Sequence, residues 1–182
     1  MTCTIGYVDG SVVIIASDSA AVADSSYTIR KGHTKVWNGP HMIIGYAGDF
    51  AVCQWIRYVF EWPLMKNVDY EGLMEYLVKA SHLIDEGLKK RFTSVQDWQL
   101  MIGCPETRRR SASLFVMYAN GDIEASAEPY AVIGSASACA LGSLYATKED
   151  STKTSWDHIQ IALEAAAAND VYIKRPWQVL YT

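Results

Sequence analysis

The sequence has no excess of positive charge and no long apolar run, and each absence excludes a class of protein. Its 182 residues carry a formal net charge of −4, whereas nucleic acid is bound largely through an excess of Lys and Arg. Charged and polar residues interrupt the apolar stretches well before the roughly 20 residues that a membrane-spanning helix requires. We therefore expect no nucleic-acid partner and no membrane partner.

Metal-binding and disulfide patterns are also missing from the sequence. The four cysteines lie far apart, show no C-x-x-C spacing and mostly stand in apolar runs; they are Cys3, Cys53, Cys104 and Cys139. The four histidines form no H-E-x-x-H or comparable motif; they are His33, His41, His82 and His158. The first residues do not resemble a secretory signal. We expect a reduced, cytoplasmic protein that uses no metal or other cofactor.

Half of the residues are hydrophobic, which is enough for one sizeable core, and we expect a single domain over residues 1–182. Three pairs of apolar or β-branched segments are each joined by turn-forming residues and predict antiparallel hairpins. The paired segments are 3–8 with 11–17, 34–37 with 41–46, and 113–119 with 122–127. The turns fall at Asp9-Gly10, Asn38-Gly39-Pro40 and Asn120-Gly121.

Four helices are predicted between and after these hairpins. Asp49 caps a helix that ends before Pro63, and Asp69 caps a longer helix that runs to about Arg91. The longer helix has one apolar face, made of Leu73, Leu77, Ala80, Ile84 and Leu88. Two further helices span about 137–147 and a segment that starts from a Ser155 cap. This order predicts an α+β fold, a four-layer αββα sandwich of two antiparallel sheets flanked by helix pairs.

Thr2 is the residue with the clearest chemical potential. Removal of Met1, which a small second residue permits, would leave this threonine with a free α-amine. An α-amine has an ordinary pKa of about 7.7 to 8.0 and can act as the base for the hydroxyl of the same residue. If Asp9 and Gly10 form the first turn, Thr2 lies opposite Ser17 and beside the carboxylate of Asp18.

Four segments resemble a known family in the same order along the chain. The opening TCTIGYVDGSVVIIASDSAA resembles the start of mature catalytic proteasome β-subunits and of HslV. The segment KGHTKVWNGPHMIIGYAGDFAVCQW is similar to the family's lysine strand, second hairpin and Ala-Gly turn. YAVIGSASACA and AAANDVY resemble its Ile-Gly-Ser segment and its supporting Asp segment. The resemblance implies the N-terminal nucleophile (Ntn) hydrolase fold and a threonine-type endopeptidase.

The resemblance also assigns roles to individual residues. The implied catalytic residues are Thr2, Asp18, Lys35, Gly48, Ser135 and Asp170. Lys35 would ease deprotonation of the Thr2 hydroxyl and Asp18 would orient that lysine. The backbone N–H of Gly48 would hold the oxyanion of the tetrahedral intermediate, while Ser135 and Asp170 would hold the α-amine and its water.

The implied substrates are peptides or unfolded proteins, and the substrate pocket would be lined by Ala21, Tyr46 and Phe50. The family also implies a ring-shaped homo-oligomer, with an ATPase unfoldase as a candidate partner. Two alternatives keep the fold. One is an inactive structural subunit, because Met1 blocks the amine and Ile173 stands where the family commonly has Ser. The other is a small-amide hydrolase that uses Cys3 after trimming of two residues.

Overall fold

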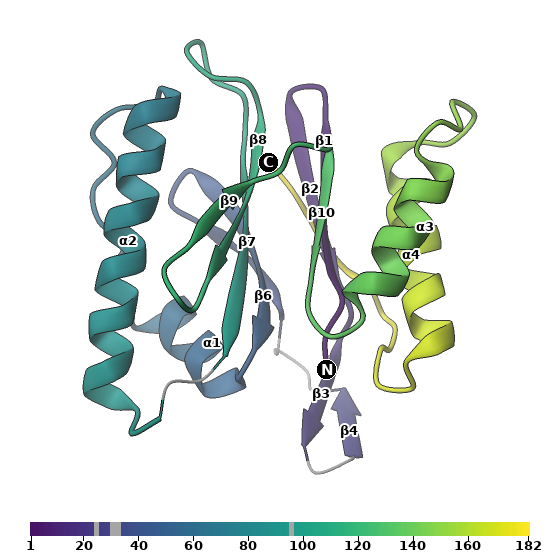
Figure 1. Ribbon diagram of the computed structural model, residues 1–182, viewed down its shortest axis with the longest axis horizontal. Coiled ribbons are helices and arrows are strands. Elements are labelled where there is room, and N and C mark those ends of the chain that lie inside the picture. Colours follow the sequence, from purple (N-terminus) through teal and green to yellow (C-terminus); the bar gives the residue numbers. More distant parts are fainter. Residues whose placement is uncertain (24–25, 30–33, 95–96) are drawn as a thin grey trace.

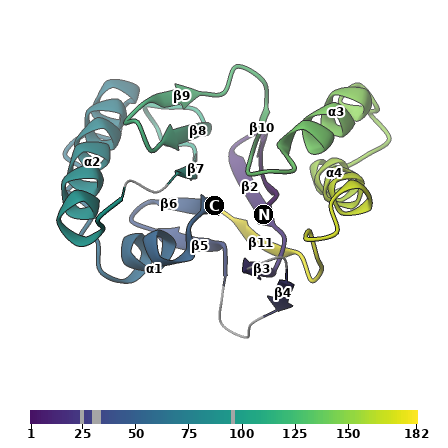
Figure 2. The same ribbon diagram turned by 60° about the horizontal axis from the view of Figure 1, so that its bottom comes forward.

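The protein is described by a computed structural model over residues 1–23, 26–29, 34–94 and 97–182; His33 lies outside these ranges. Two antiparallel sheets pack face to face, and a pair of helices covers the outer face of each sheet (Figure 1). The same four layers are visible in the second view (Figure 2). The predicted αββα sandwich is confirmed.

One sheet contains both the first and the last strand of the chain. Its order is β10-β1-β2-β11, with β1 Thr4–Asp9, β2 Val12–Ser17, β10 Tyr130–Ile133 and β11 Gln178–Tyr181. The outer face is covered by α3 Ser137–Thr147 and α4 Ser155–Asn169 (Figure 1). Ile5 and Ala16 from the sheet pack against Leu163 in α4, and all three are fully buried.

The second sheet has the order β5-β6-β7-β8-β9. Its strands are β5 Val36–Gly39, β6 Met42–Gly48, β7 Trp98–Cys104, β8 Ser113–Tyr118 and β9 Ile123–Ala125. Helices α1 Phe50–Tyr58 and α2 Tyr70–Arg91 lie on its outer face. Between the two sheets, Ile15 of the first sheet packs with Met101 and Leu114 of the second. This apolar layer holds the sheets together beneath the chain's N-terminal end.

A short third hairpin, β3 Ala20–Ala23 with β4 Ser26–Ile29, extends beyond the sandwich near the N-terminus (Figure 1). It follows directly on β2, so the residues between β2 and β3, Asp18 and Ser19, lie where the chain leaves the sheet. None of the helices in the described ranges is both long enough and apolar enough to cross a membrane.

The helix caps show how much local sequence determines. The predicted caps Asp49 and Asp69 are confirmed, because their carboxylates accept hydrogen bonds from backbone N–H groups in the first turns of α1 and α2. The predicted Ser155 cap is wrong by one residue. Thr154 caps α4 and forms a reciprocal capping box with Asp157, whose carboxylate accepts from the Thr154 N–H at 2.8 Å.

The first hairpin is present, but its predicted register is wrong by two residues. Thr4 pairs with Ser17 and Asp9 with Val12, so the turn consists of Gly10 and Ser11 rather than Asp9 and Gly10. Gly10, the first central residue, has φ of 59°, as a type II′ turn requires. A shift of two residues preserves the alternation of faces, and the carboxylate of Asp18 therefore still lies beside the start of β1.

Candidate active site

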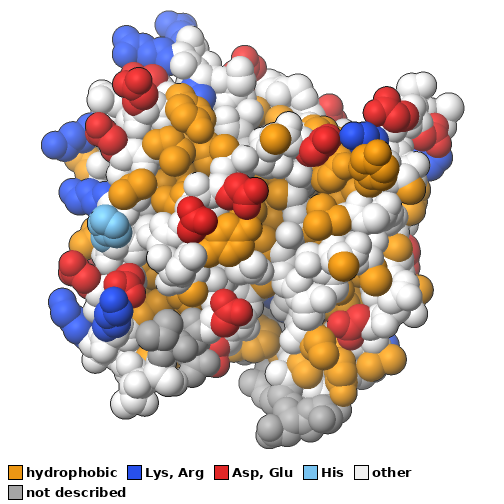
Figure 3. Space-filling view, viewed as in Figure 1, with side chains coloured by type: hydrophobic (Ala, Val, Ile, Leu, Met, Phe, Trp, Pro, Cys, Tyr) orange, Lys and Arg blue, Asp and Glu red, His pale blue; other side chains and the backbone are white. Residues whose placement is uncertain are grey.

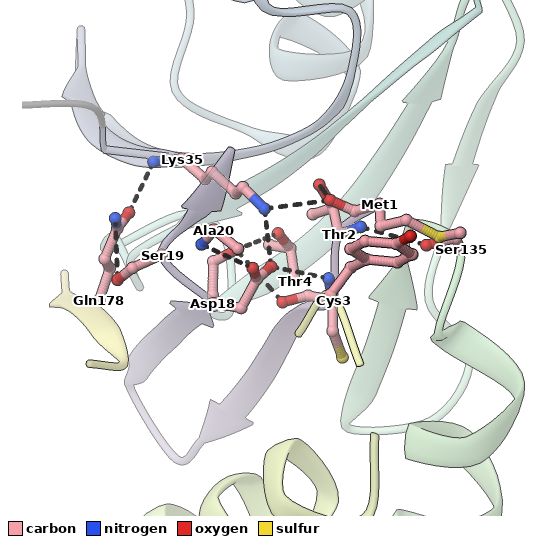
Figure 4. A network of polar contacts seen from close by, with 12 residues as sticks. Met1, Thr2, Cys3, Thr4, Asp18, Ser19, Ala20, Lys35, Ser135 and Gln178 are labelled. Atoms are coloured by element: carbon pink, nitrogen blue, oxygen red, sulfur yellow. Dashed lines mark hydrogen bonds and ion pairs between the residues drawn. The ribbon is translucent and has the colours of Figure 1, made fainter. Parts of the chain in front are cut away.

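Thr2 lies two residues before β1, next to the N-terminus of the chain, which Figure 2 places between the two sheets. It is almost completely buried, with 6% of its surface exposed. Its backbone N–H donates to Ser135 Oγ at 3.1 Å, and its Oγ1 donates to the carbonyl oxygen of Met1 at 2.7 Å (Figure 4). Both functional groups of this threonine are therefore fixed by neighbours.

Lys35 and Asp18 form a buried ion pair beside Thr2. Lys35 Nζ lies 2.8 Å from Asp18 Oδ1, and the two residues are 2% and 0% exposed. The same carboxylate accepts from the backbone N–H groups of Cys3 and Ala20, each at 3.0 Å. The ammonium group also donates to the Met1 carbonyl oxygen at 3.3 Å (Figure 4). The carboxylate is thus held by three donors and directs the lysine toward the first peptide bond.

Burial shifts the proton affinities of this cluster. The pKa of Lys35 is lowered chiefly by burial, while the negative charge of Asp18 opposes that change. The pKa of the Met1 amino group is also lowered, first by burial and then by the positive charge of Lys35. Burial raises the pKa of the Cys3 thiol to about 12, which leaves it protonated at neutral pH and a poor nucleophile.

A tight turn between β10 and α3 encloses Thr2 from the other side. This turn, residues 134–136, is called here the Gly134 turn. Ser135 accepts from the Thr2 N–H, and the Ala136 N–H donates back to the Thr2 carbonyl oxygen at 3.3 Å. Gly134 has φ of 100°, and a Cβ atom there would lie 2.3 Å from the Thr2 carbonyl oxygen. The turn can approach the threonine this closely only because position 134 has no side chain.

Asp170 lies at the C-terminal end of α4 and takes part in its own turn. Its carboxylate accepts from the Tyr172 N–H at 2.9 Å, and its carbonyl oxygen accepts from the Ile173 N–H at 3.1 Å. Its negative charge raises the pKa of the Met1 amino group, although less than the other causes act on it. Among the described residues, Asp170 thus influences the N-terminal amine through its charge, and its hydrogen bonds are local.

A cavity of about 510 Å³ opens beside Thr2. Its lining residues are Met1, Thr2, Ala47, Gly48, Asp97, Trp98, Gln99, Gly134 and Ser135. This volume falls within the range of small-ligand pockets. The predicted oxyanion-hole residue Gly48, with φ of 132°, therefore shares a cavity wall with the predicted nucleophile.

The predicted pocket residues lie outside the lining of this cavity. Tyr46 is 2% exposed, packs in the core beneath α1, and donates its hydroxyl to the Asp49 carbonyl oxygen at 2.6 Å. Ala21 and Phe50 are half-buried, in β3 and at the start of α1. The role of these three residues in substrate binding stays a prediction.

Two glutamines support the site and were not singled out from the sequence. Gln178 in β11 accepts from the Lys35 backbone N–H at 2.6 Å through Oε1, and Gln99 in β7 accepts from the Gly134 N–H at 3.1 Å. Both contacts join segments far apart in the chain, so no local pattern marks them. In the part of the chain that the structure describes, no group of three or more His, Cys, Asp or Glu side chains is arranged to hold a metal ion.

The fold is that of the Ntn hydrolases. The model of the proteasome subunit family matches residues 2–180, and the chain belongs to that family. No curated protein matches the sequence.

Several solved structures share the fold at low sequence identity. BPH from Thiobacillus denitrificans, in a complex with epoxomicin, is 16% identical with a TM-score of 0.78, covering 100% of this chain and 98% of its own. HslV from Trypanosoma brucei is 15% identical with a TM-score of 0.71, covering 98% of each chain. Anbu from Yersinia bercovieri is 16% identical with a TM-score of 0.71, covering 100% of this chain and 81% of its own.

Proposed function

We propose that this protein is a threonine-type endopeptidase whose nucleophile is the Thr2 hydroxyl after removal of Met1. One observation carries the proposal. The ammonium of the buried Lys35–Asp18 pair and the Thr2 hydroxyl both donate to the Met1 carbonyl oxygen, and Ser135 accepts the Thr2 N–H, in the wall of a cavity. A buried ion pair is a weak source of stability, since its desolvation offsets much of its attraction, so its placement beside a hydroxyl favours a chemical role.

In the proposed reaction, Thr2 Oγ attacks the carbonyl carbon of the substrate peptide bond and the freed α-amine takes the hydroxyl proton. The amine then passes this proton to the leaving nitrogen, and the peptide bond breaks to give an ester on Thr2. Water attacks the ester with the amine again as base, which releases the second product and restores the hydroxyl. The positive charge of Lys35 favours the deprotonated oxygen, and Asp18 keeps the lysine oriented.

The oxyanion formed in both steps requires a donor on the cavity side of Thr2. Gly48 lies in that wall, at the end of β6 and next to the cap of α1. Its backbone N–H is the donor that we assign to the oxyanion, and the adjacent helix N-terminus adds a favourable partial charge.

Met1 holds the site in a form that cannot turn over. Its carbonyl oxygen accepts hydrogen bonds from both the Thr2 hydroxyl and the Lys35 ammonium, and its peptide bond removes the basic amine. The active enzyme therefore requires the chain without Met1. The Cys3 alternative is disfavoured, because this thiol is fully buried and its pKa is raised to about 12.

Membership of the proteasome subunit family supports a self-assembled ring of identical copies, acting on unfolded polypeptides in the cytoplasm, with an ATPase unfoldase as a candidate partner. Figure 3 shows several groups of hydrophobic side chains on one face of the molecule, separated by charged ones. Large apolar side chains that are more than half exposed include Tyr58, Leu64, Tyr145 and Val171. Such side chains suit contacts between copies.

The proposal is tested by intact mass and peptide cleavage on the same preparation. We expect active protein to lack Met1, Thr2→Ala to abolish cleavage, and both Thr93→Ala at an exposed position and Cys3→Ala to retain it. A threonine-directed β-lactone or epoxyketone should add its mass to the wild type and not to Thr2→Ala. Active protein that retains Met1 would contradict the mechanism. Processed protein that assembles but neither cleaves nor labels would identify a structural subunit.

A further inference from the structure

Gln99 connects the two sheets at the end where Thr2 lies. It belongs to β7, where it pairs with Ala47 of β6 and with Tyr118 of β8. Its side chain crosses to the other sheet, where Oε1 accepts the N–H of Gly134, the residue after β10. Because a backbone N–H can only donate, this contact fixes the orientation of the carboxamide, with the oxygen toward Gly134.

Gln99 holds the Gly134 turn, which contacts the backbone of Thr2 on one side. Ser135 accepts the Thr2 N–H and Ala136 donates to the Thr2 carbonyl oxygen. Ser135 is itself exposed, and α3 begins at position 137 without a side-chain cap hydrogen bond. Ala136 is buried in the core beneath α3 and α4, whereas Gln99 supplies the contact that reaches the turn from the opposite sheet, at Gly134.

We propose that Gln99 is a positioning residue for the nucleophile: it fixes the Gly134 turn and thereby the Thr2 amine relative to its hydroxyl. This inference rests on the proposed function. Gln99 also lines the cavity beside Thr2, so loss of its side chain would affect the nucleophile and the cavity together unless the test separates them. A displaced nucleophile lowers kcat, whereas a lost substrate contact raises KM.

The neutrality of the carboxamide matters as much as its reach. A carboxylate at position 99 would accept the same Gly134 N–H, but its negative charge near the Thr2 amine would favour the protonated amine and raise its pKa. The rate of peptide cleavage would then rise over a higher range of pH. Glutamine provides the acceptor without that charge.

The test compares Gln99→Leu, Gln99→Glu and Gln54→Leu in the Met1-free protein. Gln54 is exposed on α1, so the same change there serves as the matched control. We expect Gln99→Leu to lower kcat on the order of tenfold with little change in KM. At high pH, the kcat of Gln99→Glu should be within about threefold of the wild-type value. The rise of its kcat with pH should occur at higher pH than in the wild type. Gln54→Leu should match the wild type.

Amide hydrogen exchange supplies a readout that does not require activity. We expect faster exchange at Gly134 and Ala136 in Gln99→Leu, and wild-type protection in Gln99→Glu and Gln54→Leu. A KM effect alone, or wild-type kcat in Gln99→Leu, would overturn the positioning role while leaving the peptidase proposal intact. Unchanged exchange in Gln99→Leu would overturn it as well. If the wild type neither cleaves nor labels, the proposed function fails and the positioning role fails with it, while exchange still decides whether Gln99 holds the turn.

Discussion

The two sides of Thr2 are built in different ways. On the hydroxyl side, Lys35 and Asp18 are almost inaccessible to solvent, and three donors hold the carboxylate. On the amine side, Ser135 is exposed and Asp170 is half-buried, and the turn that carries Ser135 is held by backbone contacts, one glutamine and the buried side chain of Ala136. The hydroxyl side is part of the folded core, whereas on the amine side we expect the exposed Ser135 side chain to be replaceable without unfolding the protein.

The largest effect should follow from Asp18→Ala, which leaves the Lys35 ammonium buried without its carboxylate. We expect unfolding to become easier by about 3 kcal/mol, together with loss of peptide cleavage. Urea denaturation monitored by tryptophan fluorescence measures the first effect. Asp85→Ala removes an exposed pair with Lys89 and should cost no more than about 0.5 kcal/mol. Equal costs for the two variants would show that the Lys35–Asp18 pair stabilises the fold no more than an exposed pair does, and would contradict its place in the core.

Changes in the Gly134 turn should separate stability from activity. Gly134→Ala places a Cβ atom against the Thr2 carbonyl in a backbone conformation that alanine rarely adopts, and should destabilise the fold by about 1 to 3 kcal/mol. Ser135→Ala removes one hydrogen bond at an exposed position and should lower kcat about tenfold at unchanged stability. Thermal melts and steady-state kinetics on both variants measure this difference. A Ser135→Ala variant that melts well below the wild type would show that the turn belongs to the core.

The smallest effect concerns the pH dependence of the rate. Burial and Lys35 lower the pKa of the N-terminal amine from its ordinary value of 8.0, and an amine acts as a base only when it is unprotonated. We expect the same at Thr2, so that cleavage rises with pH over a range centred below 8.0. Asp170→Asn removes a negative charge that raises this pKa. The rise of the cleavage rate with pH should therefore occur at lower pH in this variant than in the wild type. A pH–rate profile measures the shift, and an upward shift would contradict the electrostatic role of Asp170.

The sequence predicts best what neighbouring residues determine. Asp49 and Asp69 cap their helices as predicted, because a cap depends only on the next three residues. The first hairpin was predicted with the wrong register, since Asp9-Gly10 and Gly10-Ser11 are both acceptable turns and only the paired strands distinguish them.

Long-range contacts escaped prediction for a related reason. Strands β10 and β11 complete the first sheet by pairing with β1 and β2, which lie far away in the chain, and have no hairpin turn of their own to mark them. The resemblance supplied Lys35 and Ser135, whereas Gln99 and Gln178 act through single hydrogen bonds to backbone groups far away in the chain. A single sequence carries no local signal for such bonds.

The position of β11 has a consequence for the order in which the region around Lys35 can form. This strand pairs with β2, and its Gln178 accepts the backbone N–H of Lys35, although it follows almost all of the other described residues in the chain. A nascent polypeptide that still lacks residues 178–181 has the threonine but not the support of its lysine. The backbone of Lys35 therefore gains this contact only after β11 has joined the sheet, later than the pairing of β1 with β2 becomes possible.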